Sequence, residues 1–143
     1  MVTMMNNHTP EQRHINMSHI KSVSKEEIIV RSYLFSQGFR FRKNDKRYPG
    51  KPDVILPKYK TVIFVNGCYW HQHPGCKKAV VPTSNKKYWI PKLKRNVERD
   101  KANQAELKKQ GWNVIVVWEC MLTDANRAET LQQLNIEIRS NLM

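Results

Sequence analysis

The sequence predicts an α/β domain in which a mixed sheet is flanked by helices. Three short runs rich in β-branched residues predict strands, at Val54–Leu56, Thr61–Val65 and Asn113–Trp118. Segments of helical character stand before the first run, between the second and the third, and after the third. This order is typical of layered α/β folds, and a length of 143 residues fits a single domain.

The first predicted helix begins at Ser24. Glu27 follows three residues later, which forms a capping box for the free N–H groups of a helix start, and Gly38 is suited to end the helix. Residues 1–22 are polar without a sustained period, so we expect a flexible N-terminal arm that orders on a partner, ahead of a domain spanning 23–143. The apolar face of the first helix is expected to comprise Ile28, Leu34 and Phe35.

The later elements follow from periodicity and turn residues. Phe39–Arg42 predicts a short strand, and the runs 54–56 and 61–65, joined by the letters PKYK, predict a hairpin at the edge of a larger sheet. A long polar helix is expected over 92–110, where Gly111 stops it. The last helix is expected from about residue 124, with an apolar face of Leu131, Leu134, Ile138 and Leu142.

Charge points to the class of partner. The chain has 25 Lys and Arg against 12 Asp and Glu, a formal net charge of +13. Such a balance favours a polyanion, because each neutralised phosphate releases condensed counterions. Nucleic acid is favoured over a membrane surface, since no long amphipathic basic helix concentrates the charge. A merely soluble basic protein is the alternative explanation.

Apolar runs and cysteines bear on the compartment. The longest runs, Val62–Val65 and Val114–Trp118, are too short to span a bilayer, and nothing at the start of the sequence suggests secretion. Three cysteines in an unsecreted chain indicate thiols or metal ligands rather than disulfides. We therefore expect a cytoplasmic protein.

The densest chemistry lies in VIFVNGCYWHQHPGC, residues 62–76, where an apolar strand leads directly into cysteines, histidines and aromatics. Asp53 precedes the hairpin, at a sheet edge where a hard cation can bind, although such residues are often only turn formers. The second strand delivers Asn66, His71 and His73 to the same end of the hairpin. A carboxylate and an imidazole can therefore share one site.

Two zinc sites compete in this segment. The local one uses Cys68, His71, His73 and Cys76, which would leave no catalytic imidazole there. The dispersed one uses His73, Cys76, Cys120 and a carboxylate, with Cys68 as a small buried hydrophobe. His71 and His73 lie on the same side if the backbone is extended, so spacing alone does not separate base from ligand.

Aromatic residues accompany the basic regions. Tyr69, Trp70, Tyr88 and Trp89 suit stacking on exposed bases, although aromatics in small domains are as often core. The run 77–99 carries eight basic residues and one acidic residue, which suits a phosphate track or a solvated face.

Four ordered blocks resemble one family. PGKPDVIL (49–56), VIFVNGCYWHQHPGC (62–76), NVERD (96–100) and GWNVIVVWEC (111–120) are similar to motifs of the very-short-patch repair (Vsr) DNA mismatch endonucleases, from about residue 17 to 120. The resemblance implies a restriction-endonuclease-like fold and a Mg²⁺-dependent enzyme that nicks one DNA strand 5′ of the T in a T:G mismatch. Such mismatches arise when 5-methylcytosine deaminates.

The resemblance also implies residue roles. Asp53 would bind Mg²⁺ together with the backbone carbonyl of Val65, His71 would be the catalytic histidine, and Glu27 would support them. The structural zinc ligands would be His73, Cys76, Asp100 and Cys120. The rings that stack on DNA would be Tyr69, Trp70 and Trp89, with Met17 approaching from the arm.

This chain departs from the family pattern in places. Asn66 stands where members commonly have a second histidine, and Tyr69 where they have phenylalanine. Asn66 cannot take up a proton, so any auxiliary role of that histidine becomes neutral hydrogen bonding or is absent. The chain is also one residue short between Met17 and Glu27.

The resemblance implies further partners. The functional partners would be a cytosine-5 DNA methyltransferase and general mismatch-repair proteins. We also expect a monomeric enzyme that associates with the nucleoid and not with a membrane. The alternatives are a restriction-type or structure-specific nuclease and a non-catalytic, zinc-stabilised DNA-binding protein.

Overall fold

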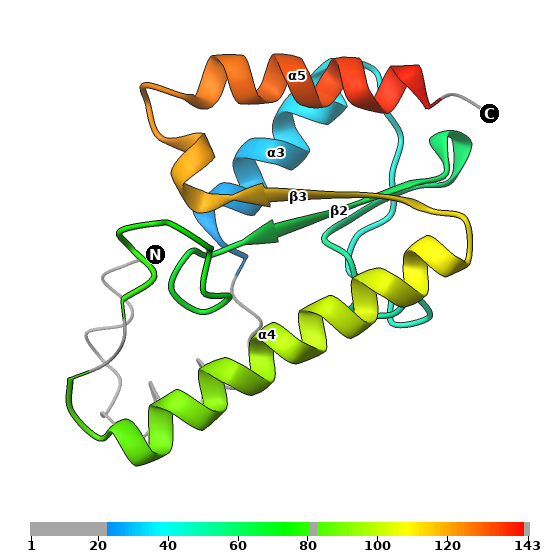
Figure 1. Ribbon diagram of the computed structural model, residues 1–143. Coiled ribbons are helices and arrows are strands. Elements are labelled where there is room, and N and C mark those ends of the chain that lie inside the picture. The colour runs from blue at the N-terminus through cyan, green and yellow to red at the C-terminus, as the bar shows by residue number, and fades with distance from the viewer. Residues whose placement is uncertain (1–22, 81–82, 142–143) are drawn as a thin grey trace, which may run out of the picture.

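The computed structural model describes residues 23–80 and 83–141. The predictions made for the arm 1–22, including the DNA contact of Met17, lie outside these residues. The elements appear in the predicted order of helix, strands, helix, strand and helix (Figure 1). They are α3 (Lys25–Ser36), β1 (Val54–Leu56), β2 (Thr61–Asn66), α4 (Lys86–Lys109), β3 (Asn113–Trp118) and α5 (Arg127–Ser140).

The strands form a mixed three-stranded sheet in the order β1-β2-β3. β1 and β2 make the predicted antiparallel hairpin, whose turn is the 3-10 segment Pro57–Tyr59 followed by Lys60 in the left-handed region. β2 and β3 are parallel, because α4 carries the chain back along the sheet between them (Figure 1). Both strands therefore end at the same edge, where residues 67–76 and 119–122 continue the chain.

Helices cover both faces of the sheet, with α3 and α5 on one side and α4 on the other (Figure 1). Ile63 of β2 belongs to the larger core cluster together with Leu34 of α3 and Ile138 of α5. Its neighbours Val62 and Phe64 point the other way and belong to the cluster of Leu107. Two-sided burial explains why the strands are continuous apolar runs rather than alternating ones. The predicted α/β class is confirmed.

The apolar face predicted for the first helix is wrong in part. Leu34 is fully buried, but Ile28 and Phe35 are 53% and 62% exposed. The inward positions are instead Val30 and Glu27, at helical spacing from Leu34. Helix α3 thus turns a carboxylate toward the sheet.

Element boundaries differ in three places. Phe39–Arg42 is not a full strand, because only Arg42 makes an isolated bridge, to Ile55. Helix α4 begins six residues before the predicted start and includes Pro91. The proline removes the N–H that would reach the carbonyl of Lys87, which is exposed near the helix start and can bind water instead.

Helix α5 begins at Arg127, after the 3-10 segment Glu119–Leu122 and a turn. Its predicted apolar residues Leu131, Leu134 and Ile138 are buried, whereas Leu142 lies outside the described residues. In the described part of the chain, no helix combines the length and the apolar character that crossing a membrane requires.

Candidate active site and metal centre

A cavity of about 240 Å³ opens where β2 ends, between α3 and α4. All three residues predicted to be catalytic, Glu27, Asp53 and His71, line it. Val65 and Asn66, the last two residues of β2, contribute to the same wall. The remaining lining residues are Gly50, Lys51, Phe64, Asp100, Asn103 and Gln104.

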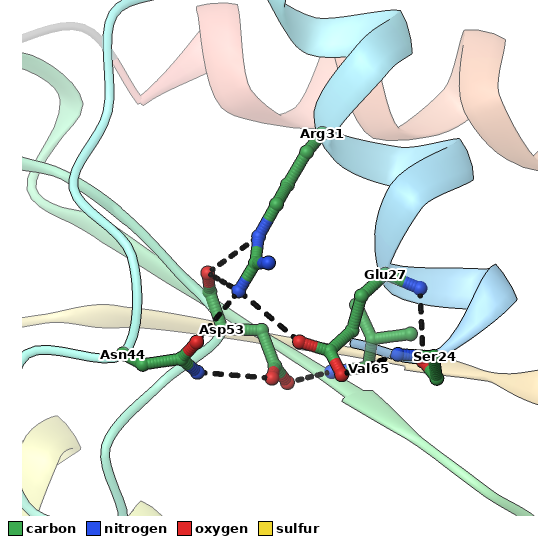
Figure 2. Close-up of polar contacts among 6 residues, drawn as sticks. All are labelled: Ser24, Glu27, Arg31, Asn44, Asp53 and Val65. Atoms are coloured by element: carbon green, nitrogen blue, oxygen red, sulfur yellow. Dashed lines mark hydrogen bonds and ion pairs between the residues drawn. The ribbon is translucent and has the colours of Figure 1, made fainter. Parts of the chain in front are cut away.

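Asp53 is held directly before β1 by its neighbours (Figure 2). The backbone N–H of Val65 donates to Asp53 Oδ2 at 2.7 Å, and the Asn44 side chain donates to Oδ1 at 3.3 Å. Burial, together with the nearby Glu27 carboxylate, raises the pKa of Asp53 to about 6, although the Val65 hydrogen bond lowers it. The buried Glu27 and the half-buried Asp53, side by side, form a site that a cation would stabilise.

Glu27 serves two purposes at once. Its Oε1 accepts a hydrogen bond from the Ser24 N–H at 3.2 Å, and its own N–H donates to Ser24 Oγ at 3.1 Å, which completes the predicted capping box. The carboxylate also reaches the cavity beside Asp53 (Figure 2). Capping thus orients the Glu27 side chain toward the site.

Arg31 is a site residue that the sequence analysis missed. Its guanidinium donates to the Asp53 carbonyl at 2.9 and 3.3 Å and to Asn44 Oδ1 at 2.9 Å, and it pairs with Glu27 Oε2 at 3.1 Å (Figure 2). A single guanidinium therefore joins α3 to the segments on both sides of the Pro-Gly turn. The spacing of Arg31 four residues after Glu27 was the available signal.

His71 is paired with Asp100. His71 Nδ1 lies 2.5 Å from Asp100 Oδ2, a contact between the loop after β2 and helix α4. A carboxylate at Nδ1 favours the tautomer that carries its proton there, which leaves Nε2 free to accept one. Asp100 was expected among the zinc ligands, and the structure places it at the histidine instead.

The potential metal ligands converge in a second cluster. Cys68, His73, Cys76 and Cys120 present ligand atoms that all lie within 4.8 Å of one another. His73 Nδ1 is 3.6 Å from Cys68 Sγ and 3.4 Å from Cys120 Sγ. Ligands around a tetrahedral zinc ion stand about 3.5–3.8 Å apart, so three thiols and one imidazole at this spacing fit zinc.

This group differs from both sets considered from the sequence. Cys68 takes the place of His71 in the local set and of Asp100 in the dispersed set. Cys68 is buried as expected, and burial raises the pKa of its thiol to about 12, but its sulfur faces the cluster. His73 is held there by stacking on Trp118, with ring centroids 4.2 Å apart.

Backbone turns explain why His71 does not join the thiol cluster. The N–H of His71 donates to Gly67 O and that of His73 to Cys68 O, so this segment is folded into turns rather than extended. Gln72 lies between the histidines with φ of 48°, in the left-handed region. The condition of an extended backbone is therefore not met, and the two imidazoles part: the first contacts α4 and the second contacts the thiols.

The predicted stacking rings form a continuous cluster. Trp70 contacts Tyr69 with centroids 5.2 Å apart and Trp89 with centroids 5.7 Å apart, and Trp89 contacts Tyr88. Trp70 and Tyr88 are 48% and 53% exposed. Large rings left half in solvent beside a charged helix are typical of binding surfaces rather than cores.

An imidazole with one free nitrogen, placed in the same cavity as paired carboxylates on a strongly basic chain, suits hydrolysis of a phosphodiester. The class of protein defined by this fold and site is therefore a nuclease. Residues 5–78, just over half of the chain, match the family described as DNA mismatch endonuclease Vsr, and the chain belongs to this family. It is accordingly a DNA endonuclease of mismatch repair.

Similar proteins bear names that agree with this assignment. The chain is 53% identical over 116 residues to the type II nicking enzyme V.NmeAIP of Neisseria meningitidis serogroup A, which covers 81% of each chain. It is 43% identical to the type II nicking enzyme V.XorIIP of Xanthomonas oryzae pv. oryzae, over 85% of this chain and 89% of the relative. It is 40% identical to the DNA mismatch endonuclease Vsr of Escherichia coli K12, over 71% and 69%.

Proposed function

We propose that this endonuclease requires Mg²⁺ and nicks one strand 5′ of the T in a T:G mismatch that arises from deamination of 5-methylcytosine. The observation that carries the chemistry is the convergence of Glu27, Asp53 and His71 on one cavity. The substrate rests on the family, which is described as a mismatch endonuclease, and on the nicking activity named for the relatives.

Asp53 is the proposed side-chain ligand of Mg²⁺, and the Val65 carbonyl is the proposed backbone ligand. The N–H of Val65 points at Asp53. Because the N–H and the C=O of one strand residue face the same side of the strand, the Val65 carbonyl is also expected to face Asp53. When bound, Mg²⁺ would stabilise the negative charge that develops on the phosphate. Glu27 supplies further negative charge beside it.

His71 is the proposed general base. Its Nε2 takes the proton of the attacking water, and Asp100 at Nδ1 stabilises the imidazolium that forms. Asn66, buried on the same wall of the cavity, can orient water by neutral hydrogen bonding but cannot exchange its proton. Among the described residues that line the cavity, His71 is the one imidazole, and it carries proton transfer in this proposal.

The thiol cluster is proposed as a structural zinc site. It ties the loop after β2, through Cys68, His73 and Cys76, to Cys120 after β3. All four positions are occupied by protein ligands, which is typical of structural rather than catalytic zinc. Zinc would thus fix the loop that presents His71.

The ring cluster is proposed to insert beside the mismatch. Trp70, assisted by Tyr69 and Trp89, would stack on opened bases, and Met17 of the arm would approach from the other side. Opening a base step costs a few kcal/mol, and less at a mismatch, while each stack returns about 1–3 kcal/mol. This difference supports preference for T:G over T:A.

The wider assignments are part of the same proposal. Residues 1–22 form a DNA-contacting arm and 23–143 a restriction-endonuclease-like domain that acts as a monomer. A cytosine-5 DNA methyltransferase creates the need for this repair, and general mismatch-repair proteins are its further functional partners. The support for these statements is the family membership.

The decisive experiment compares nicking of matched T:G and T:A duplexes with Mg²⁺ present. The proposal requires nicking of the T-containing strand of T:G and little cutting of T:A, together with at least about a hundredfold loss in Asp53→Asn and in His71→Ala. Asp124→Asn, an exposed carboxylate paired with Arg127, is the matched control and should nick normally. Equal cutting of both duplexes would instead indicate a restriction-type nuclease.

A further inference from the structure

A second hollow adjoins the catalytic cavity. It measures about 620 Å³ and lies between the segment Lys46–Lys51 and helix α4. We propose that it holds a backbone phosphate of the nicked DNA strand next to the phosphate that is cut. This inference rests on the proposed function, because it names the path of the substrate through that site.

The two hollows are continuous. They share the lining residues Gly50, Lys51, His71, Asp100 and Asn103. Phosphates recur about every 3.4 Å of rise along one DNA strand. A strand whose scissile phosphate lies beside Asp53 and His71 therefore places a neighbouring phosphate in the second hollow.

The charge of the second hollow suits a phosphate. Lys46, Lys51 and Arg99 line it, and none of them has an ion-pair partner among the residues that the structure describes. The carboxylate in the lining, Asp100, is already bonded to His71. Unpaired cations around an open hollow are the donors that a diester oxygen requires.

Arg47 belongs to the same wall but is already occupied. Its guanidinium binds Asp45 through Nη2 to Oδ2 at 2.7 Å and Nε to Oδ1 at 3.0 Å. This pairing lowers the pKa of Asp45 to about 2. The hollow therefore contains free cations and one neutralised cation at similar positions, which supplies an internal comparison.

The segment that carries these cations is built into the fold. A side chain on Gly50 would meet Asn103 of α4 and Phe64 of β2 at 3.1 Å, so the backbone is packed against both. Tyr48 contacts Trp112 edge to face at 5.4 Å, and the N–H of Lys51 donates to Tyr48 O at 3.0 Å. The cations are thus presented on a fixed frame, which reduces the ordering that binding would require.

The test measures binding of the full chain to a T:G duplex without added Mg²⁺, so that no strand is cut. Lys51→Gln and Arg99→Gln should each weaken binding about five- to tenfold and lower the slope of log K against log salt by about one. The double variant Asp45→Asn/Arg47→Gln should change both quantities much less, because the ion pair that it removes has no net charge. Lys58→Gln, at the hairpin turn outside the hollow, is the control for net charge.

Placement is tested with duplexes in which one phosphate beside the nick is a neutral methylphosphonate. When the neutral group replaces the phosphate that the hollow holds, wild type should bind the duplex more weakly than the unmodified one. Lys51→Gln should bind the modified and the unmodified duplex equally, because its contact with that phosphate is already removed. Equal additional losses in wild type and in Lys51→Gln at both neighbouring positions would overturn the proposal. This assay measures binding and the nicking assay measures cutting, so the two proposals can fail separately. Loss of T:G preference in nicking would contradict the proposed function alone, and an unchanged affinity of Lys51→Gln would contradict the phosphate site alone.

Discussion

His71 Nδ1 and Asp100 Oδ2 lie 2.5 Å apart, joining the loop after β2 to the middle of helix α4. The contact assigns Asp100 to the imidazole and removes it from the thiol cluster. It also makes α4 part of the proposed catalytic frame, because this strongly basic helix holds the partner of the proposed base. Nuclease chemistry and zinc binding can therefore be separated by substitution.

Asp100→Asn should retain zinc and lose nicking. The amide cannot stabilise an imidazolium and can hold His71 in the wrong tautomer, so we expect at least about a hundredfold slower nicking with normal binding of T:G duplex. Zinc content per chain and single-turnover nicking of one preparation check both parts. Loss of zinc in this variant would return Asp100 to the ligand set.

Cys68→Ser, in contrast to Asp100→Asn, should lose zinc. A ligand lost from a structural zinc site removes folding free energy directly, so zinc content and melting temperature should fall together. Cys76→Ser and Cys120→Ser should behave alike if the three thiols bind one ion. Full zinc content in Cys68→Ser, with only a small change in melting temperature, would reduce Cys68 to a packing residue.

Arg31→Ala should raise the Mg²⁺ concentration needed for half-maximal nicking by about tenfold or more. Without the guanidinium, Glu27 and the Asp53 segment lose the group that fixes their separation. Arg31→Lys keeps the charge but not the fork, and should fall between wild type and Arg31→Ala. Arg127→Ala, which also removes a carboxylate and a carbonyl bond from a helix, is the control. An unchanged Mg²⁺ requirement in Arg31→Ala would show that Arg31 contributes to folding stability but does not position the Mg²⁺ site.

The protonation of Asp53 should couple folding stability to pH. Its pKa rises from 3.8 to about 6 on folding, so the folded protein binds a proton that the unfolded chain has released between these values. This contribution is complete below pH 3.8 and is lost as pH rises through about 6, where ionised carboxylates are left without a cation. Mg²⁺ bound to the ionised form of Asp53, as proposed, would reverse the effect.

The check is the melting temperature of wild type and Asp53→Asn between pH 4.5 and 7.5. The advantage of the asparagine variant should grow with pH in the absence of Mg²⁺, and added Mg²⁺ should stabilise wild type alone, more at pH 7.5 than at pH 5. A difference between the two proteins that is constant with pH would contradict the raised pKa.

Trp70→Ala should reduce nicking efficiency on T:G duplex about tenfold to a hundredfold through lost stacking. Its melting temperature should change little, because the ring is 48% exposed in the free protein. Trp112→Ala is the matched control, since Trp112 packs against the core cluster of Leu107 and should lower stability instead. Large destabilisation of Trp70→Ala with unchanged T:G selectivity would exclude insertion.

Sequence reasoning succeeded where the signal was local. The hairpin, the strand Asn113–Trp118 and the capping box each have a signal within a few residues, and Glu27, Asp53 and the end of β2 come together in one cavity. The residues alone left His71 as either a zinc ligand or a base, and the family resemblance implied the catalytic role. The structure agrees in placing it on the same cavity.

The thiol cluster differs from the predicted zinc set at one position, where Cys68 stands in place of Asp100. Spacing alone left the roles of the two histidines open, because a non-glycine residue with positive φ is uncommon and nothing in the letters His-Gln-His indicates that Gln72 adopts it. That turn directs His73 to the thiols and leaves His71 beside Asp100. Arg31 was missed for a different reason: three of its four contacts are with residues 13 and 22 positions away, which periodicity does not detect.

The parallel register pairs Val65 with Val117 and Asn66 with Trp118, so β2 and β3 leave the sheet side by side. Residues at or directly after these two strand ends line the cavity of Asp53 and His71 and form much of the thiol cluster. A one-residue insertion or deletion between Val65 and His73 would therefore displace both centres together, whereas the hairpin turn at Pro57–Tyr59 lies at the opposite end of the strands (Figure 1). Engineered tags and changes in chain length belong at that distant turn, and the linker between the two histidines has in effect a fixed length.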